Sequence, residues 1–380
     1  MGRVAVAVIV SLWVISVSIL VNRIVPEPYM DEIFHIPQAQ QYCIANFRSW
    51  DPMITTPPGL YYLSLVHVAS LFPSMFMVQA ASSFSEVCTT AILRSVNGVL
   101  AVLCSIIVCC IAYCSACYVS CMLEEELLVQ CNGLLNEVEV ILLALWHRKW
   151  ELLVSFSPFL MVFVAFLAFV HWNGSVVLGA KEAHTVSPHF AQIMYFGLVS
   201  ALAVSPLHCS IGQIVDLFQS FWKRRPISFF QVLIAVTAGF FSVHFYSIAH
   251  PYLIADNRHY PFYLWRKVIN AHWSMKYLLV PLYVYSWFSI LSALGKVQRK
   301  IWILAFFLAT AAVLVPAPLI ELRYYTIPLY FMILHSHIND YQSWLLMGLI
   351  YLALNVFTMT IFLFRPFHWD HEPGIQRFIW

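Results

Sequence analysis

Residues 26–63 read PEPYMDEIFHIPQAQQYCIANFRSWDPMITTPPGLYYL and gather acidic, histidine, glutamine and proline side chains in a chain with little charge elsewhere. They follow an apolar segment long enough to cross a membrane, so Asp31 and Glu32 are expected a few residues beyond the hydrocarbon edge. Apolar residues at helical spacing after this acidic pair predict a short helix along the bilayer surface. Pro57 and Pro58 then interrupt the chain before the next apolar segment. This stretch is the candidate functional site.

The composition of the 380-residue chain is that of an integral membrane protein. Hydrophobic residues make up 61% of the sequence and charged residues only 10%, whereas soluble domains carry about a quarter charged residues. The net charge of +2 is small and scattered, so no basic stripe indicates nucleic-acid binding. Since backbone polar groups must be satisfied within the bilayer, the sequence predicts an all-α, multispanning membrane fold.

Apolar runs of bilayer-spanning length recur along the chain. A further run, Tyr324–His335, is short, and Gly59–Ala81 is interrupted by Pro73, which favours an interfacial or re-entrant helix. We therefore expect about eight to ten transmembrane helices in a single polytopic domain, residues 1–380. The runs of full length are Val4–Val21, Val96–Cys121, Leu152–Trp172, Phe190–Cys209, Phe229–Ala249, Tyr277–Leu294, Ile301–Pro318 and Trp344–Phe364.

Lysine and arginine in short loops predict the orientation of the chain. The basic clusters at 147–149, 223–225 and 296–300 are assigned to the cytosol. An atypical segment, 122–151, falls on the same side, and within it Leu123–Glu139 is predicted to be an acidic amphipathic helix. The loops on the opposite side are then 22–95, 173–189, 250–276 and 319–323.

The opposite-side loops carry the unusual polar residues, which predicts a shared catalytic chamber beside the bilayer. Ordinary solvated loops are the alternative, because clusters of ionisable residues mark sites only statistically. The residues concerned are Asp31, Glu32, His35 and Asp51, then Lys181, Glu182, His184 and His189, then Asp256, Asn257, Arg258 and His259, and finally Glu321 and Arg323.

One coherent reaction for such a chamber is glycosyl transfer from a lipid-linked donor. It needs a carboxylate that takes a proton from the attacking hydroxyl and cations that hold the leaving phosphate. Asp31 is the first choice as base and Glu32 the second, because adjacent carboxylates on a helix point in different directions. The alternative is that both residues only cap the interfacial helix.

Arg258 and His259 are the predicted phosphate-binding residues, because arginine offers several planar donors to phosphate oxygens. Tyr260 follows them and could pack against a prenyl chain or a sugar. Arg323 is a second candidate cation, although pairing with Glu321 is an equally good interpretation. The complete set of predicted substrate-binding residues is His35, Gln38, Asp51, Lys181, His184, Asn257, Arg258, His259, Tyr260 and Arg323.

Neither a metal nor a cofactor is expected. Asp31 and His35 form an i, i+4 pair without a third and fourth ligand, and no P-loop or GxGxxG motif is present. Cys114 and Cys117 form a CxxC with no second ligand pair, so zinc or a disulfide framework is not expected. Six cysteines in one apolar run are interpreted as small apolar residues of a membrane helix: Cys104, Cys109, Cys110, Cys114, Cys117 and Cys121.

Several long motifs resemble a known family. The segments YMDEIFHIPQAQQYC and WDPMITTPPGLY, then LIADNRHYPFYLWRKV, KYLLVPLY, ELRYYTIP and IQRFIW, are similar to the dolichyl-phosphoglucose-dependent α-1,2-glucosyltransferase family. The resemblance covers Tyr29–Leu63 and, more diffusely, His171–Trp380.

The resemblance implies a GT-C type, multipass enzyme of the endoplasmic reticulum membrane whose first loop is lumenal. Its expected partners, besides the lipid bilayer, are dolichyl phosphate glucose as donor and the diglucosylated, dolichyl-diphosphate-linked oligosaccharide as acceptor. An α bond made from a β donor implies a single inverting displacement without a divalent metal. The matching acidic pair assigns the role of base to Asp31, with Glu32 beside it.

The chain departs from the family between Cys121 and about Phe156, where the expected membrane segments and their polar motifs are missing. A shortened form is therefore implied. The alternative function is a catalytically inactive membrane protein that regulates another integral membrane protein, such as a channel.

Overall fold

A computed structural model describes residues 2–73, 86–122, 133–223, 225–336, 338, 340–370 and 374–379. The chain divides into two compact units, Met1–His184 (unit 1) and Thr185–Trp380 (unit 2). The described residues form helices, with isolated bridges and no β-sheet among them. The all-α, multispanning prediction is confirmed. That one domain comprises all 380 residues stays a prediction.

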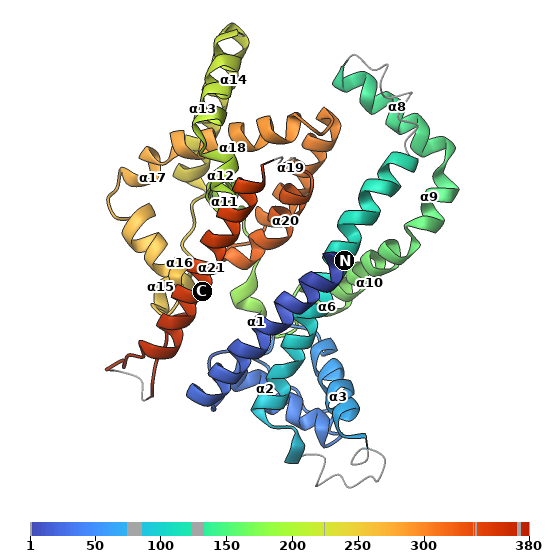
Figure 1. Cartoon of the computed structure of the whole chain (residues 1–380), viewed down its shortest axis with the longest axis vertical. Coiled ribbons are helices and arrows are strands. Elements are labelled where there is room, and N and C mark those ends of the chain that lie inside the picture. The colour runs from blue at the N-terminus through green and yellow to red at the C-terminus, as the bar shows by residue number, and fades with distance from the viewer. Residues whose placement is uncertain are drawn as a thin grey trace. The chain divides into compact units, whose positions relative to one another are not determined.

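Unit 1 begins with α1 (Gly2–Ile24), which lies along α6 (Thr90–Met122; Figure 1). The predicted interfacial helix is α2 (Glu32–Cys43), and it packs against the short apolar helix α3 (Gly59–Leu71). The other helices in the described part of the unit are α8 (Leu134–His147), α9 (Lys149–Ser155), α10 (Ser157–Asn173) and the 3-10 helix η1 (Lys181–His184).

Unit 2 packs its helices around α11 (Ala191–Ala203) and α18 (Val280–Gly295). Between these two helices the chain forms α12 (Ser205–His208), α13 (Ile211–Lys223), α14 (Arg225–Phe245), α15 (Pro251–Ala255), α16 (Tyr260–Leu264), the π-helix η2 (Trp265–Ile269) and α17 (Met275–Leu278). After α18 come α19 (Lys300–Leu314), the 3-10 helix η3 (Leu322–Tyr325), α20 (Thr326–Leu334) and α21 (Tyr341–Phe364).

Each predicted span overlaps one helix or two consecutive helices, and these helices differ in length. Five segments of the described chain are long and apolar enough to cross a membrane, or six if the bent pair α9–α10 is one span. Helices α3, α11 and α19 are apolar but shorter than 18 residues. The predicted number of eight to ten spans therefore stays a prediction.

The predicted span Leu152–Trp172 is not one straight helix, which corrects the sequence interpretation. It divides at Phe156 into α9 and α10, which are bent by 72°. Pro158 lies in the first turn of α10 and has no N–H to continue the preceding helix. Residues 123–132 of the predicted acidic helix lie outside the described residues, as do the side chains of Cys114 and Cys117.

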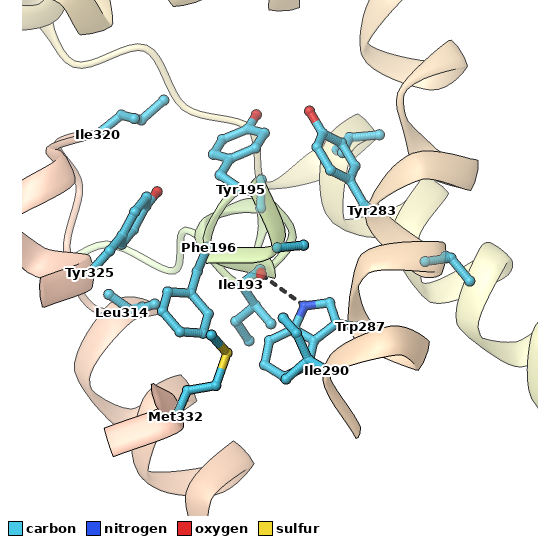
Figure 2. Close-up of a cluster of buried hydrophobic side chains, with 14 of the residues drawn as sticks. Ile193, Tyr195, Phe196, Tyr283, Trp287, Ile290, Leu314, Ile320, Tyr325 and Met332 are labelled. Carbon is cyan, nitrogen blue, oxygen red and sulfur yellow. Dashed lines mark hydrogen bonds between the residues drawn. The ribbon is translucent and has the colours of Figure 1, made fainter. Parts of the chain in front are cut away.

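The core of unit 2 is aromatic and closely packed. Trp287 on α18 donates from Nε1 to the carbonyl oxygen of Ile193 on α11, at 2.9 Å, and its ring packs against Phe196 (Figure 2). A Cβ on Gly197 would lie 2.6 Å from Trp287 Nε1, so glycine is what allows the two helices to approach. Membrane helices commonly use small residues in this way.

The C-terminal tail returns to the loop before α16. The backbone N–H of Ile379 donates to the carbonyl of Arg258 at 2.8 Å, and the N–H of Tyr260 donates to the carbonyl of Ile379 at 3.1 Å. Arg377 donates from Nη1 to the carbonyls of Phe362 and Leu363, which terminate α21. The tail and the loop 250–276 are therefore in direct contact.

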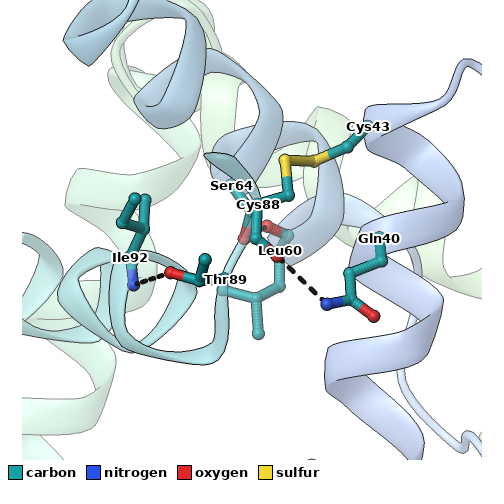
Figure 3. The surroundings of a disulfide bond; sticks show 7 residues. All are labelled: Gln40, Cys43, Leu60, Ser64, Cys88, Thr89 and Ile92. Carbon is teal, nitrogen blue, oxygen red and sulfur yellow. Dashed lines mark hydrogen bonds between the residues drawn. A yellow bond between two sulfur atoms is a disulfide. The ribbon is translucent and has the colours of Figure 1, made fainter. Parts of the chain in front are cut away.

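Cys43 and Cys88 form a disulfide that the sequence interpretation did not anticipate (Figure 3). Cys43 ends α2 and Cys88 precedes α6, 45 residues later, and Gln40 binds the carbonyl of Cys88 beside the bond. The expectation of no disulfide was wrong for this pair, because tertiary packing brings the two cysteines together. Disulfides persist in oxidising compartments, which supports the assignment of loop 22–95 to the lumenal side.

Candidate active site

Glu32, the second residue of the acidic pair, is bound by Arg94 of α6. The guanidinium holds both carboxylate oxygens, with Nε–Oε1 at 2.9 Å and Nη2–Oε2 at 2.6 Å. It also donates to Asn22 Oδ1 at 2.9 Å, and to the backbone carbonyls of Val25 and Glu27 at 2.7 and 3.0 Å. Only 9% of the Arg94 side chain is exposed. Arg94 thus binds the end of α1, the connecting loop and the start of α2 at the same time.

Asp31, unlike Glu32, is exposed and is not held by a cation among the described residues. It lies at the N-terminal boundary of α2, is exposed, and makes no side-chain capping hydrogen bond. No ion pair or hydrogen bond engages its carboxylate among the residues that the structure describes. Met30, directly before it, adopts a φ of +58°, a conformation that persists only where surrounding contacts enforce it. The pair is therefore divided, with Glu32 engaged in structure and Asp31 available for chemistry.

The remaining predicted residues of this stretch mainly stabilise it. His35 bonds through Nδ1 to the hydroxyl of Tyr61 at 2.6 Å instead of pairing with Asp31. Burial, and then the charges of Tyr42 and Asp51, raise the pKa of Tyr61 to about 12, so the phenol stays protonated. Gln38 is buried and accepts from the Asp51 backbone N–H at 3.0 Å.

The loop that carries Lys181 and His184 packs on the same unit. Lys181 donates from Nζ to the carbonyl of Asn173 at 2.6 Å, and His184 ends η1. The backbone N–H of Leu178 donates to the carbonyl of Thr55 at 3.0 Å. Two of the four loops predicted to share a side, 22–95 and 173–189, are therefore in contact.

Arg258 in unit 2 is occupied by its own neighbour, Asp256. Its Nε and Nη2 bind the carboxylate at 2.8–3.1 Å, and Nη1 donates to Gln376 Oε1 at 2.8 Å. Burial alone would raise the pKa of Asp256, but the hydrogen bonds and charge of Arg258, with His259, hold that pKa below its usual range. Arg258 therefore links the loop to the C-terminal tail with its charge neutralised, and its phosphate-binding role stays a prediction.

The side chains next to Arg258 differ in whether their hydrogen-bonding groups are already engaged. His259 Nε2 lies 3.6 Å from Asp256 Oδ2. Asn257 accepts from the indole N–H of Trp369 at 2.9 Å, which leaves its amide nitrogen as a donor. The Tyr260 hydroxyl is buried without a hydrogen-bond partner among the described residues.

Arg323 pairs with Glu321, which is the alternative that the sequence left open. Its Nε and Nη2 bind the two carboxylate oxygens, the latter at 2.9 Å. The Arg323 side chain is 70% exposed. Its role as a second phosphate-binding residue stays a prediction.

A cavity of about 560 Å³ opens in unit 2 between residues 254–270, which include α16 and η2, and residues 368–370 of the tail. Ligand sites in proteins usually measure about 300–1,000 Å³. The polar and indole side chains that line the cavity are Asn257, Trp265, Arg266, Asn270, His368, Trp369 and Asp370. Arg258, Tyr260 and Arg323 do not line it.

His189 contacts two other segments of unit 2. Its ring is fully buried, with Nδ1 near the carbonyl of Pro318 at 3.2 Å and Nε2 accepting from the Ile248 backbone N–H at 3.3 Å. Burial lowers the pKa of His189 to about 4, so the ring is neutral at physiological pH. His189 ends the predicted loop 173–189 and thus contacts the residues that lead into the predicted loops 250–276 and 319–323.

Sequence reasoning missed one group of residues in unit 1 and two in unit 2. Arg94 is a single charge near the start of a long apolar helix, which is itself a signal for a paired residue. Arg266 was passed over in favour of the loop arginine, Arg258, and the tail residues 368–370 carried no motif. Among the described residues no group of three His, Cys, Asp or Glu could hold a metal. That none is needed stays a prediction.

Comparison with known proteins identifies relatives over the whole chain. A protein of Arabidopsis thaliana named Dol-P-Glc:Glc(2)Man(9)GlcNAc(2)-PP-Dol alpha-1,2-glucosyltransferase is 46% identical, over 100% of both chains. Proteins of the same name from Homo sapiens and Drosophila melanogaster are 29% and 27% identical, over 94% of both chains and over 92% and 93% respectively. No solved structure matches the chain.

The matches also bear on the length of this chain. The alignment with the Arabidopsis protein has 509 positions, 129 more than this chain has residues. The family model matches residues 25–124 and 123–334 as two pieces that meet at residues 123–124. By these matches, the chain belongs to the DIE2/ALG10 family.

Proposed function

We propose that the protein transfers glucose from dolichyl phosphate glucose, in α-1,2 linkage, to the diglucosylated, dolichyl-diphosphate-linked oligosaccharide of N-glycan precursor assembly. The relatives carry this activity in their names, and the motifs around Asp31 belong to the matched region. Several apolar helices support a multipass membrane protein. The activity implies residence in the endoplasmic reticulum membrane.

The reaction is a single inverting displacement. The 2-hydroxyl of the acceptor glucose attacks the anomeric carbon of the donor, and a new C–O bond forms with α configuration. The bond from that carbon to the phosphate oxygen breaks, and dolichyl phosphate leaves with the electron pair. Asp31 takes the proton of the attacking hydroxyl, an effect worth typically about 10²–10⁴-fold in rate.

The division of labour in the acidic pair carries this assignment. The Glu32 carboxylate is held by Arg94 and cannot swing towards a substrate without breaking two charge-assisted hydrogen bonds. The Asp31 carboxylate is exposed at the start of the same helix. The disulfide beside α2 supports a lumenal position for this helix, on the side where a lumenal glycan acceptor is available.

The test is the lipid-linked oligosaccharide profile of cells that lack the endogenous enzyme and express only this chain. We expect the wild-type chain to restore the terminal glucose and Asp31→Asn to abolish it at equal protein level. Glu27→Gln removes an exposed carboxylate from the same loop and is the matched control, with transfer retained. Full transfer by Asp31→Asn would remove Asp31 from the role of base.

The same experiment tests the alternative function. A wild-type chain that inserts at normal level and restores no terminal glucose would contradict the enzyme assignment and favour a non-catalytic regulator of another membrane protein. The directly joined family segments at residues 123–124 are the observation that favours this second candidate.

A further inference from the structure

We propose that the 560 Å³ cavity of unit 2 binds the sugar-phosphate headgroup of the lipid donor, with Arg266 as the phosphate-binding cation. This inference rests on the proposed function, because it assigns that reaction's donor to a particular site. It assigns the leaving phosphate to a residue that the motif-based prediction, centred on Arg258, did not include.

The charge of Arg266 is available, whereas that of Arg258 is not. Arg258 binds Asp256 through two of its nitrogens and Gln376 through the third. Arg266 is exposed, lines the cavity, and forms no ion pair within the described part of the chain; its guanidinium lies 5.8 Å from the ring centroid of Phe262. An unpaired guanidinium in a cavity is suited to bind a phosphate through two parallel hydrogen bonds.

The backbone places Arg266 at the cavity through an unusual turn. Residues 265–269 form a π-helix, closed by the bond from the Asn270 N–H to the Trp265 carbonyl at 2.8 Å. Trp265, Arg266 and Asn270 consequently line the same cavity. Single π-turns are uncommon and occur frequently at functional sites.

The other lining residues indicate the chemical class of the ligand. Trp265 and Trp369 offer flat apolar faces of the kind that sugar rings pack against, and Asn257 and Asn270 offer amide donors. Asp370 would repel a bare phosphate, but it can accept hydrogen bonds from sugar hydroxyls. A ligand that carries both a hexose and a phosphate can bind Arg266 through the phosphate and Asp370 through the sugar hydroxyls. A phosphate alone or a neutral sugar alone would engage only one of these two charged residues.

The experiment compares Arg266→Ala and Arg266→Lys with Lys267→Gln in the full-length protein purified in detergent. Lys267 is the next residue, also exposed, and does not line the cavity, so it controls for a general loss of positive charge. The probe is a short-chain prenyl phosphate glucose whose binding is measured directly. The same measurement is made with Asp31→Asn, in which the proposed base is removed.

We expect Arg266→Ala to weaken probe binding about 10–100-fold, the loss typical of a charge-assisted pair of hydrogen bonds, and Arg266→Lys to weaken it less. Lys267→Gln and Asp31→Asn should bind as the wild type does. Prenyl phosphate without the sugar should bind more weakly than the glucosylated probe. In turnover, the KM for donor should rise with Arg266→Ala while the KM for acceptor stays unchanged.

Equal binding by wild type and Arg266→Ala would overturn the proposal, as would an equal loss in Lys267→Gln. A rise in the KM for acceptor alone would assign the cavity to the acceptor diphosphate instead and would equally overturn it. Since probe binding needs no turnover, an inactive chain that still binds the probe through Arg266 would contradict the proposed function without contradicting this site.

Discussion

Replacing Arg94 by glutamine should lower turnover more than it lowers the amount of folded protein. Arg94→Gln removes the guanidinium that holds Glu32, Asn22 and two backbone carbonyls of the loop before Asp31. Breaking a buried ion pair costs about 3–5 kcal/mol when the remaining charge stays buried. Because the Glu32 side chain is 32% exposed and can become hydrated, we expect the lower end, about 3 kcal/mol.

The effect on catalysis follows from the position of Asp31, which Arg94 does not touch. Without the hydrogen bonds of Arg94, the strained backbone of Met30 can relax and the start of α2 can shift. A displacement of about 1 Å at a reacting group costs about 100-fold in rate. We therefore expect kcat to fall about 10–100-fold with little change in the KM for donor.

The assay combines turnover per folded molecule with thermal unfolding in detergent. Glu32→Gln and the Arg94→Gln, Glu32→Gln double variant complete a cycle, and the double variant should be more stable than Arg94→Gln because no carboxylate is left unpaired. Arg94→Lys should recover part of the rate. If Arg94→Gln lowers stability while turnover per folded molecule is unchanged, the reasoning that Arg94 positions Asp31 is refuted.

Two further predictions concern stability. Replacing Cys43 and Cys88 together by alanine should lower the free energy of unfolding by about 4 kcal/mol, as the chain-entropy relation gives for a 45-residue separation. Reductant should lower the melting temperature of the wild type but not that of this variant. Equal sensitivity of the two proteins to reductant would contradict the disulfide. His189 has a folded pKa of about 4 against about 6.5 unfolded, so its stabilising effect is complete above pH 6.5 and is lost as the pH falls. Unfolding at pH 7 and pH 5 should show a loss of about 2 kcal/mol that His189→Gln removes, and an identical loss in that variant would refute the role of this histidine.

The sequence located most helices, because long apolar runs between polar loops leave few alternatives in a bilayer. It also located the acidic pair at the start of a short helix, α2. It could not divide the roles of Asp31 and Glu32, because the partner that distinguishes them, Arg94, is 62 residues away from Glu32. The bend at Phe156 was foreseeable, since Pro158 interrupts an otherwise uniform apolar run.

In unit 2 the motif around Arg258 marks the segment that contributes to the cavity, but Arg258 itself is paired with Asp256 and its phosphate-binding role stays a prediction. A basic residue in a conspicuous motif is a natural candidate for substrate binding, yet Asp256, only two residues earlier, neutralises it. The less conspicuous Arg266 acquires its setting from the π-turn and from the tail, neither of which leaves a periodic pattern in the sequence. Contacts between segments that are distant in the chain were therefore the part that sequence reasoning could not supply.

The position of the tail has a consequence for biosynthesis. One wall of the cavity is made by residues 254–270 and another by residues 368–370, so the first wall is synthesised about 100 residues before the second. At about 5–20 residues per second, the earlier wall stands open for about 5–20 s while α18 to α21 are inserted. A nascent chain arrested before the last span would carry the π-turn of Arg266 without residues 368–370, so under the proposed donor site it would bind the donor lipid only once its last residues are translated.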